Sequence, residues 1–152
     1  QKPNIDMTAH SIVVLSYLTG QSHNMTLPTH VTLVCNAVQC LVQLLSRGAL
    51  SLSGVTLKTL TDVCQLGLLH RTWEIRETFL RLISALMREC HAVCVQLKHV
   101  VTDKLRDVEP FVVMAALQIF QGLSREQWSE WHSHVIDALS QCLEHEDAAV
   151  RV

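Results

Sequence analysis

The chain has 152 residues, 49% of them hydrophobic, and its 12 basic and 14 acidic residues give a net charge of −2. This hydrophobic content is ample for a buried core and excludes a disordered chain, while the lack of any dense run of Lys and Arg argues against direct binding of DNA or RNA. Only 5% aromatic residues, five Gly and three Pro favour an all-α fold over a β-rich one.

Hydrophobic residues recur at intervals of three and four along almost the whole chain, which indicates amphipathic helices. In chain order we predict helices over residues 8–19, 30–47, 55–69, 73–89, 92–106, 110–123, 127–143 and from 147 onward. Loops with Gly, Ser and Asn separate the first three helices, and Ser124 stands where it would cap the helix at 127–143.

Neither a membrane span of roughly 18 apolar residues nor a signal peptide is recognisable. The first residue is Gln1, and a helical pattern is still running at Val152. We therefore expect residues 1–152 to be a single segment of a longer chain, located inside the cell and without membrane contact.

An internal repeat organises these helices. The segment Trp73-Glu74-Ile75-Arg76 aligns with Pro110-Phe111-Val112-Val113 and with Ala148-Ala149-Val150-Arg151, at steps of 37 and 38 residues. A helix pair of this length cannot bury its apolar face alone, so such pairs stack. The sequence predicts an α-solenoid of about four antiparallel helix pairs, at residues 8–47, 55–89, 92–123 and 127–152.

The period and the turn residues resemble those of HEAT repeats, an armadillo-like helical family with repeats of about 40 residues. The residues that carry the resemblance lie at the predicted turns: Trp73, Ile75, Arg76, Asp107, Pro110 and Arg151. In HEAT proteins the Arg commonly reaches an acidic residue of the adjacent turn. Because Val113, His70 and His145 interrupt this series here, a complete Arg–Asp ladder is not predicted.

Chemistry of a catalytic or metal site is not indicated. The six cysteines sit among Val, Leu and Ala at helical spacing, which favours free, packed thiols in a reducing compartment. Cys90, His91, Cys94 and His99 invite a metal-site interpretation, but they lack the Cys-x-x-Cys spacing of structural zinc sites. We expect no enzyme activity, no cofactor and no small-molecule substrate.

Trp128 and Trp131 are spaced i, i+3 near a predicted helix start. One of the two is expected to pack under the turn and the other to be a partly exposed anchor for a partner. Trp131 and Arg81 are the candidate partner-binding residues.

A closer resemblance runs from about Asn36 to Leu123. The stretch Leu69-His70-Arg71-Thr72-Trp73-Glu74-Ile75-Arg76-Glu77 and the apolar helix after it resemble the BRCA-associated ATM activator family. The resemblance implies a HEAT scaffold in nucleus and cytoplasm, linked to the DNA damage response through the ATM kinase and to the RNA-cleavage module of the Integrator complex. It implies no particular partner-binding residue.

The leading hypothesis is therefore a non-enzymatic scaffold whose partners are other proteins. A transport or vesicle-coat adaptor of the karyopherin or adaptin type is the alternative with the same fold. A small helical metalloprotein that uses Cys90, Cys94 and neighbouring histidines is the alternative of another class.

Overall fold

The computed structural model describes residues 28–48, 50, 52 and 54–151, and this part of the chain is entirely helical. Its elements are α2 (Pro28–Ser46), α3 (Gly54–Leu68), α4 (Trp73–Glu89), α5 (His91–Asp103), the 3-10 turn η1 (Lys104–Arg106), α6 (Pro110–Gln121), α7 (Arg125–Leu143) and α8 (Ala148–Arg151). The predicted all-α class is thus confirmed for the described residues. The predicted helix at 8–19 lies outside them.

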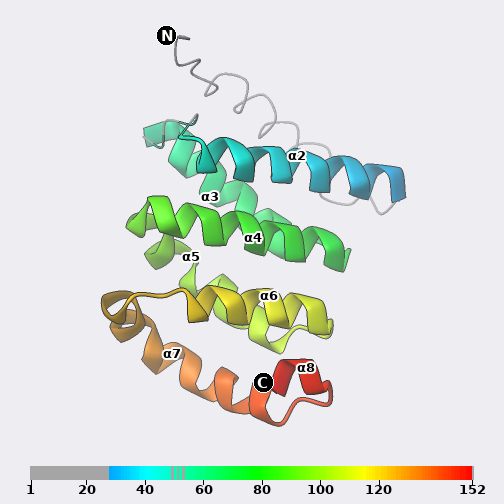
Figure 1. Cartoon of the computed structure of the whole chain (residues 1–152), viewed down its shortest axis with the longest axis vertical. Helices are drawn as coiled ribbons and strands as arrows, with labels where there is room; N and C mark the ends of the chain where they lie inside the picture. Colours follow the sequence, from blue (N-terminus) through cyan, green and yellow to red (C-terminus); the bar gives the residue numbers. More distant parts are fainter. Residues whose placement is uncertain (1–27, 49, 51, 53, 152) are drawn as a thin grey trace.

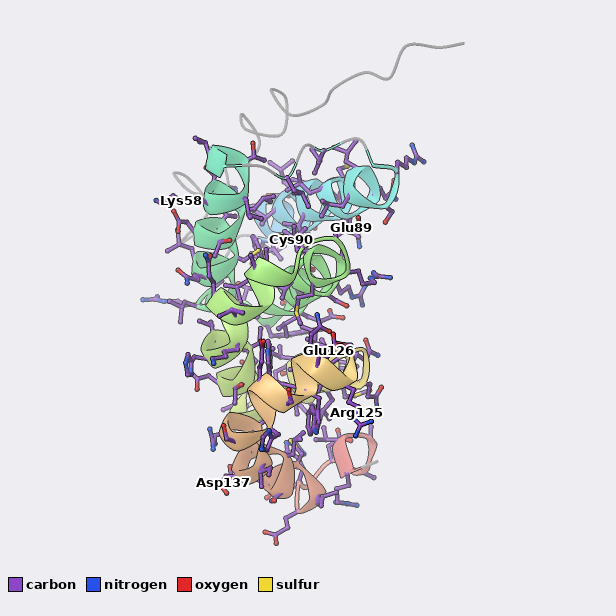
Figure 2. The ribbon with its side chains drawn as sticks, turned by 90° about the vertical axis from the view of Figure 1, so that its left-hand side faces the viewer. Lys58, Glu89, Cys90, Arg125, Glu126 and Asp137 are labelled. Carbon is purple, nitrogen blue, oxygen red and sulfur yellow. The ribbon has the colours of Figure 1, made fainter. Side chains whose placement is uncertain are left out.

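The helices form two layers (Figure 1). One layer contains α2, α4, α6 and α8, each packed on the next, and the other contains α3, α5 and α7 in the same order. Figure 2 shows the layers from the side: α7 begins near α6 at Arg125 and Glu126, and it has crossed to the α3 and α5 side by Asp137. Helices of one layer therefore alternate along the chain with helices of the other.

Helix α4 is the centre of the described structure because it packs on α2, α3, α5 and α6. It buries about two side chains per turn, and they point in several directions: Ile75, Thr78, Phe79, Leu80, Leu82, Ile83, Ala85, Leu86 and Met87. A helix that is apolar over much of its circumference needs neighbours on more than one side. The two-layer arrangement supplies them.

Helix α2 is, by length and composition, apolar enough to cross a membrane. Its buried residues, Val34, Val38, Leu41 and Leu45, nevertheless form one stripe at helical spacing, and α2 packs on α4. Thr32, Asn36 and Gln43 are exposed. An apolar stripe with exposed polar positions is the pattern of a helix packed at the edge of a helical layer.

Candidate interaction surface and helix joints

Three short connections, which we call joints, link the layers: residues 69–72 between α3 and α4, 107–109 between η1 and α6, and 144–147 between α7 and α8. In each joint one side chain accepts a hydrogen bond from the backbone N–H two residues later. The acceptors are His70 Nδ1 (from Thr72), Asp107 Oδ1 (from Glu109) and His145 Nδ1 (from Asp147), each at 3.0 Å.

His70, Asp107 and His145 are 37 and 38 residues apart, so the same turn recurs at the period of the sequence repeat. A carboxylate oxygen and an imidazole nitrogen both accept a hydrogen bond close to the backbone. The two histidines therefore preserve the turn, although they lack the negative charge of Asp107. In the alignment of the repeats, the two histidines appear only as the absence of the acidic residue.

Arg76 connects two consecutive joints. Its Nε and Nη2 donate to Asp107 Oδ2 and Oδ1, both at 2.9 Å, and its Nη1 donates to the carbonyl oxygens of His70 and Arg71 at 2.8 and 2.9 Å. The side chains of Arg76 and Asp107 are only 11% and 6% exposed. One Arg–Asp contact between consecutive joints is therefore present, although Val113, His70 and His145 interrupt the series in the sequence.

Lys104 adds a second cation to this site, with its Nζ 3.9 Å from Asp107 Oδ2. Burial lowers the pKa of Lys104, and the charge of Arg76 acts in the same direction, whereas Asp107 and Asp103 oppose the shift. Asp107 is therefore the charge that allows two cations to lie close together at this joint.

The other predicted joint residues also lie where the helices meet. Ile75 is 1% exposed in the core, and Pro110 is the first residue of α6. Trp73, at the start of α4, stacks on Phe111 of α6 with ring centroids 5.2 Å apart and an interplanar angle of 19°. Trp73 therefore ties together the starts of two consecutive helices of one layer.

Arg151 repeats half of the Arg76 arrangement. Its Nη1 donates to the carbonyl oxygens of His145 and Glu146 at 2.6 and 2.8 Å, the two carbonyls equivalent to those that Arg76 contacts. The repeat alignment of Arg76 with Arg151 thus corresponds to the same local structure.

The structure corrects the choice of Trp131 as a partner-binding residue. Trp131 is 1% exposed, and its ring meets Phe120 edge to face at a centroid distance of 5.3 Å. It cannot contact a partner without leaving the core, whereas Trp128 is 37% exposed. The i, i+3 spacing of the two tryptophans does not show which of them faces the core, because this depends on the tilt of α7. Arg81 is on the surface, paired with Glu77.

The cysteines differ more than the sequence suggests. Cys64 and Cys142 are buried, and burial raises the pKa of both thiols. Cys40, in contrast, is exposed, which corrects the expectation that every cysteine is packed. Its position in α2 is away from the buried stripe of that helix.

Among the described residues, no three His, Cys, Asp or Glu side chains gather as metal ligands would. Of the cysteine and histidine set considered for a metal, Cys90 is half-buried at the end of α4 (Figure 2). The side chains of His91 and Cys94 lie outside the described part of the structure.

Two surface hollows lie near α7. The larger, about 800 Å³, lies between the ends of α4 and α6 and the start of α7, and Arg88, Glu126 and Glu130 line it together with Met87 and Leu123. The other, about 470 Å³, lies between α6, α7 and α8 and has a mainly apolar lining: Leu117, Phe120, Gln121, Trp128, Ile136, Leu139, Ser140, Cys142, Leu143, Val150 and Arg151. The lining residues come from three helices, so this second hollow cannot be predicted from the sequence.

No protein-family model, no curated protein and no solved structure matches the chain.

Proposed function

We propose that this chain is a segment of a HEAT-type α-solenoid and that it acts as a non-enzymatic scaffold for other proteins. The observation that carries the proposal is the recurrence of one joint, with the same side chain to backbone hydrogen bond at His70, Asp107 and His145. A recurring joint places successive helix pairs in the same relative orientation. This is the property that generates a solenoid with long, continuous surfaces.

The surface chemistry supports protein partners. The larger hollow combines Arg88 and Met87, residue types that are enriched at protein interfaces, with a polar border that includes Glu126 and Glu130. Arg81 is exposed on α4, the helix that also contributes Arg88. We propose the surface of α4, from Arg81 to this hollow, as the partner-binding face.

The resemblance to the BRCA-associated ATM activator family supplies the setting: the DNA damage response through the ATM kinase, or the RNA-cleavage module of Integrator, in nucleus and cytoplasm. A direct test immobilises the purified chain and measures its binding to purified ATM kinase and to that Integrator module by biolayer interferometry. We expect one of the two to bind. Absence of binding to both, with binding of cargo peptides instead, would favour the adaptor alternative.

A pair of matched variants tests the binding face. Arg81→Glu is expected to weaken binding about tenfold, because reversing an interface charge removes an attraction and adds a repulsion. Lys58→Glu is the control, since Lys58 is also an exposed cation in an i, i+4 ion pair but belongs to α3, in the other layer. Equal losses in both variants would argue against a specific face on α4.

A further inference from the structure

We propose that the apolar face of α7 is the binding surface for a helical hairpin. The first helix of this hairpin continues in line with α8, and its second helix lies beside α7. A carboxylate that follows the second helix binds Arg151. This inference rests on the repeat architecture of the proposed function and extends it to a particular surface. The hairpin would cover α7 as α4 and α5 cover α3.

One position of the repeat is buried in two repeats and exposed in the third. The residue two places before the joint acceptor is Leu68, Leu105 or Leu143, and these side chains are 0%, 2% and 67% exposed. Leu68 is buried in α3, which packs on both α4 and α5, and Leu105 is buried in η1, which packs on α6 and α7. Leu143 thus occupies a position that is part of the core in the other two repeats. The described residues contain no helix that buries it.

The residues around Leu143 extend this surface. Six places before the acceptor, Cys64 and Val101 are fully buried, whereas Leu139 is only half-buried. Ile136 is 52% exposed, and both line the hollow of about 470 Å³ between α6, α7 and α8. Several large apolar side chains around one hollow indicate a face that another element packs against.

Arg151 determines the charge of the occupant. Its Nη1 donates to the carbonyl oxygens of His145 and Glu146, which are equivalent to the two carbonyls that Arg76 contacts. The Nε and Nη2 groups bind Asp107 in Arg76, but in Arg151 they have no acceptor among the described residues. Asp107 follows Arg76 by 31 positions, after α4, α5 and η1. A hairpin in the same register therefore brings a carboxylate to Arg151 in the same bidentate geometry.

The chain itself supplies a hairpin with which to test this surface. In a fusion of residues 1–151 followed directly by a second copy of residues 77–123, Arg151 takes the sequence position of Arg76 and the second Asp107 follows at the native spacing. We expect the added segment to fold on α7, seen as slow amide hydrogen exchange in its helices. Exchange at unfolded-chain rates throughout the added segment would overturn the proposal.

Leu143→Asp tests whether the added segment packs on α7 or is only covalently linked to it. In the original chain it should leave the thermal midpoint unchanged, because Leu143 is already 67% exposed, whereas in the fusion it should lower the midpoint. Leu69→Asp is the matched control, since Leu69 is 66% exposed beside another joint, and it should have no effect in either protein. An equal response of the fusion to both variants would refute the proposed contact.

The predicted ion pair has its own readout. In the fusion, Arg151→Ala and Asp107→Ala in the second copy should each lower the midpoint, and the double variant should lower it by less than the sum. Additive losses would show that the two groups do not meet. If the original chain proves to be a dimer that Leu143→Asp dissociates, the occupant is a second copy and the hairpin assignment is wrong. None of these measurements needs a partner protein, so failure of the proposed scaffold function would remain distinguishable.

Discussion

At the scale of single residues, Arg76 shows why guanidinium chemistry is needed at a joint. Its planar group reaches both oxygens of Asp107 and two backbone carbonyls at the same time. A lysine ammonium has no such fork and would satisfy fewer of these acceptors. Because both charged side chains are nearly buried, removal of Arg76 leaves the Asp107 carboxylate with only Lys104, whose Nζ is 3.9 Å away and cannot replace the bidentate contact.

Arg76→Ala is therefore expected to reduce the free energy of unfolding by about 3–5 kcal/mol, the usual consequence of breaking a buried ion pair. Urea unfolding at neutral pH, followed by circular dichroism, measures this change. Arg81→Ala is the control, because its ion pair with Glu77 is on the surface and contributes about 0.5 kcal/mol or less. Comparable losses for the two variants would contradict the structural role of Arg76.

Gly67 is a second residue whose role is visible only in three dimensions. It lies inside α3, where replacement of Gly by Ala ordinarily stabilises a helix by about 1 kcal/mol. A methyl group at this position would overlap the ring of Phe79 in α4, and Phe79 is itself only 3% exposed. Overpacking therefore opposes the helix propensity.

We expect Gly67→Ala to lower stability by about 1–3 kcal/mol, the cost typical of overpacking, instead of raising it. Thermal unfolding of the variant measures the sign directly. Gly67→Ala combined with Phe79→Leu tests the cause, because the smaller side chain should recover part of the loss. A variant more stable than the natural chain would mean that α3 and α4 are not in this close contact.

At the scale of elements, α7 owes its start to a capping box. The Ser124 hydroxyl accepts from the backbone N–H of Gln127 at 3.2 Å, and the Gln127 side chain accepts from the N–H of Ser124 at 2.9 Å. These bonds satisfy two backbone donors that would otherwise lack partners. They fix the point at which the chain leaves α6 and enters the other layer.

Ser124→Ala should cost about 1 kcal/mol and increase amide exchange in the first turn of α7. Hydrogen exchange read by mass spectrometry locates the effect. Ser129→Ala is the matched control: the Ser129 hydroxyl donates to the carbonyl oxygen of Glu126 within the same helix and caps no free N–H. Faster exchange spread evenly over α7 in both variants would contradict a local capping role.

At the scale of the whole molecule, each helix packs mainly on its neighbours in the two layers. The stability of such a stack is approximately a sum of repeat and interface contributions, so it varies along the chain. Helix α4 has partners in both layers, whereas α8 has only four residues and is packed on α6 and α7. Opening should therefore be easiest at α8.

Native-state hydrogen exchange is expected to show the slowest amides in α4 and the fastest helical amides in α8, with α6 between them. The comparison within one molecule needs no variant, and Arg76→Ala offers a further check by increasing exchange at the joints around residues 70 and 107. One uniform rate of opening for α4, α6 and α8 would indicate a single cooperative unit and would contradict neighbour-by-neighbour stacking.

Local features follow directly from the amino-acid sequence. The helix predicted at 73–89 coincides with α4, the helix predicted from residue 110 begins at Pro110, and Ser124 caps α7 as expected. Helical periodicity, proline at a helix start and a capping serine act over a few residues, so they can be read from neighbouring letters. The spacing of 37 and 38 residues between joints is equally a property of the sequence.

Which side chains meet, in contrast, depends on how the helices pack in three dimensions. Trp131 faces the core, where its ring meets Phe120 of α6, and Trp128 faces the surface. Arg76 binds Asp107 because two joints are adjacent in space. The exposure of Leu143, at a position that is buried in two other repeats, is likewise visible only when neighbouring helices are in place. Periodicity shows that a helix has an apolar face, but the partner of that face depends on packing between distant segments.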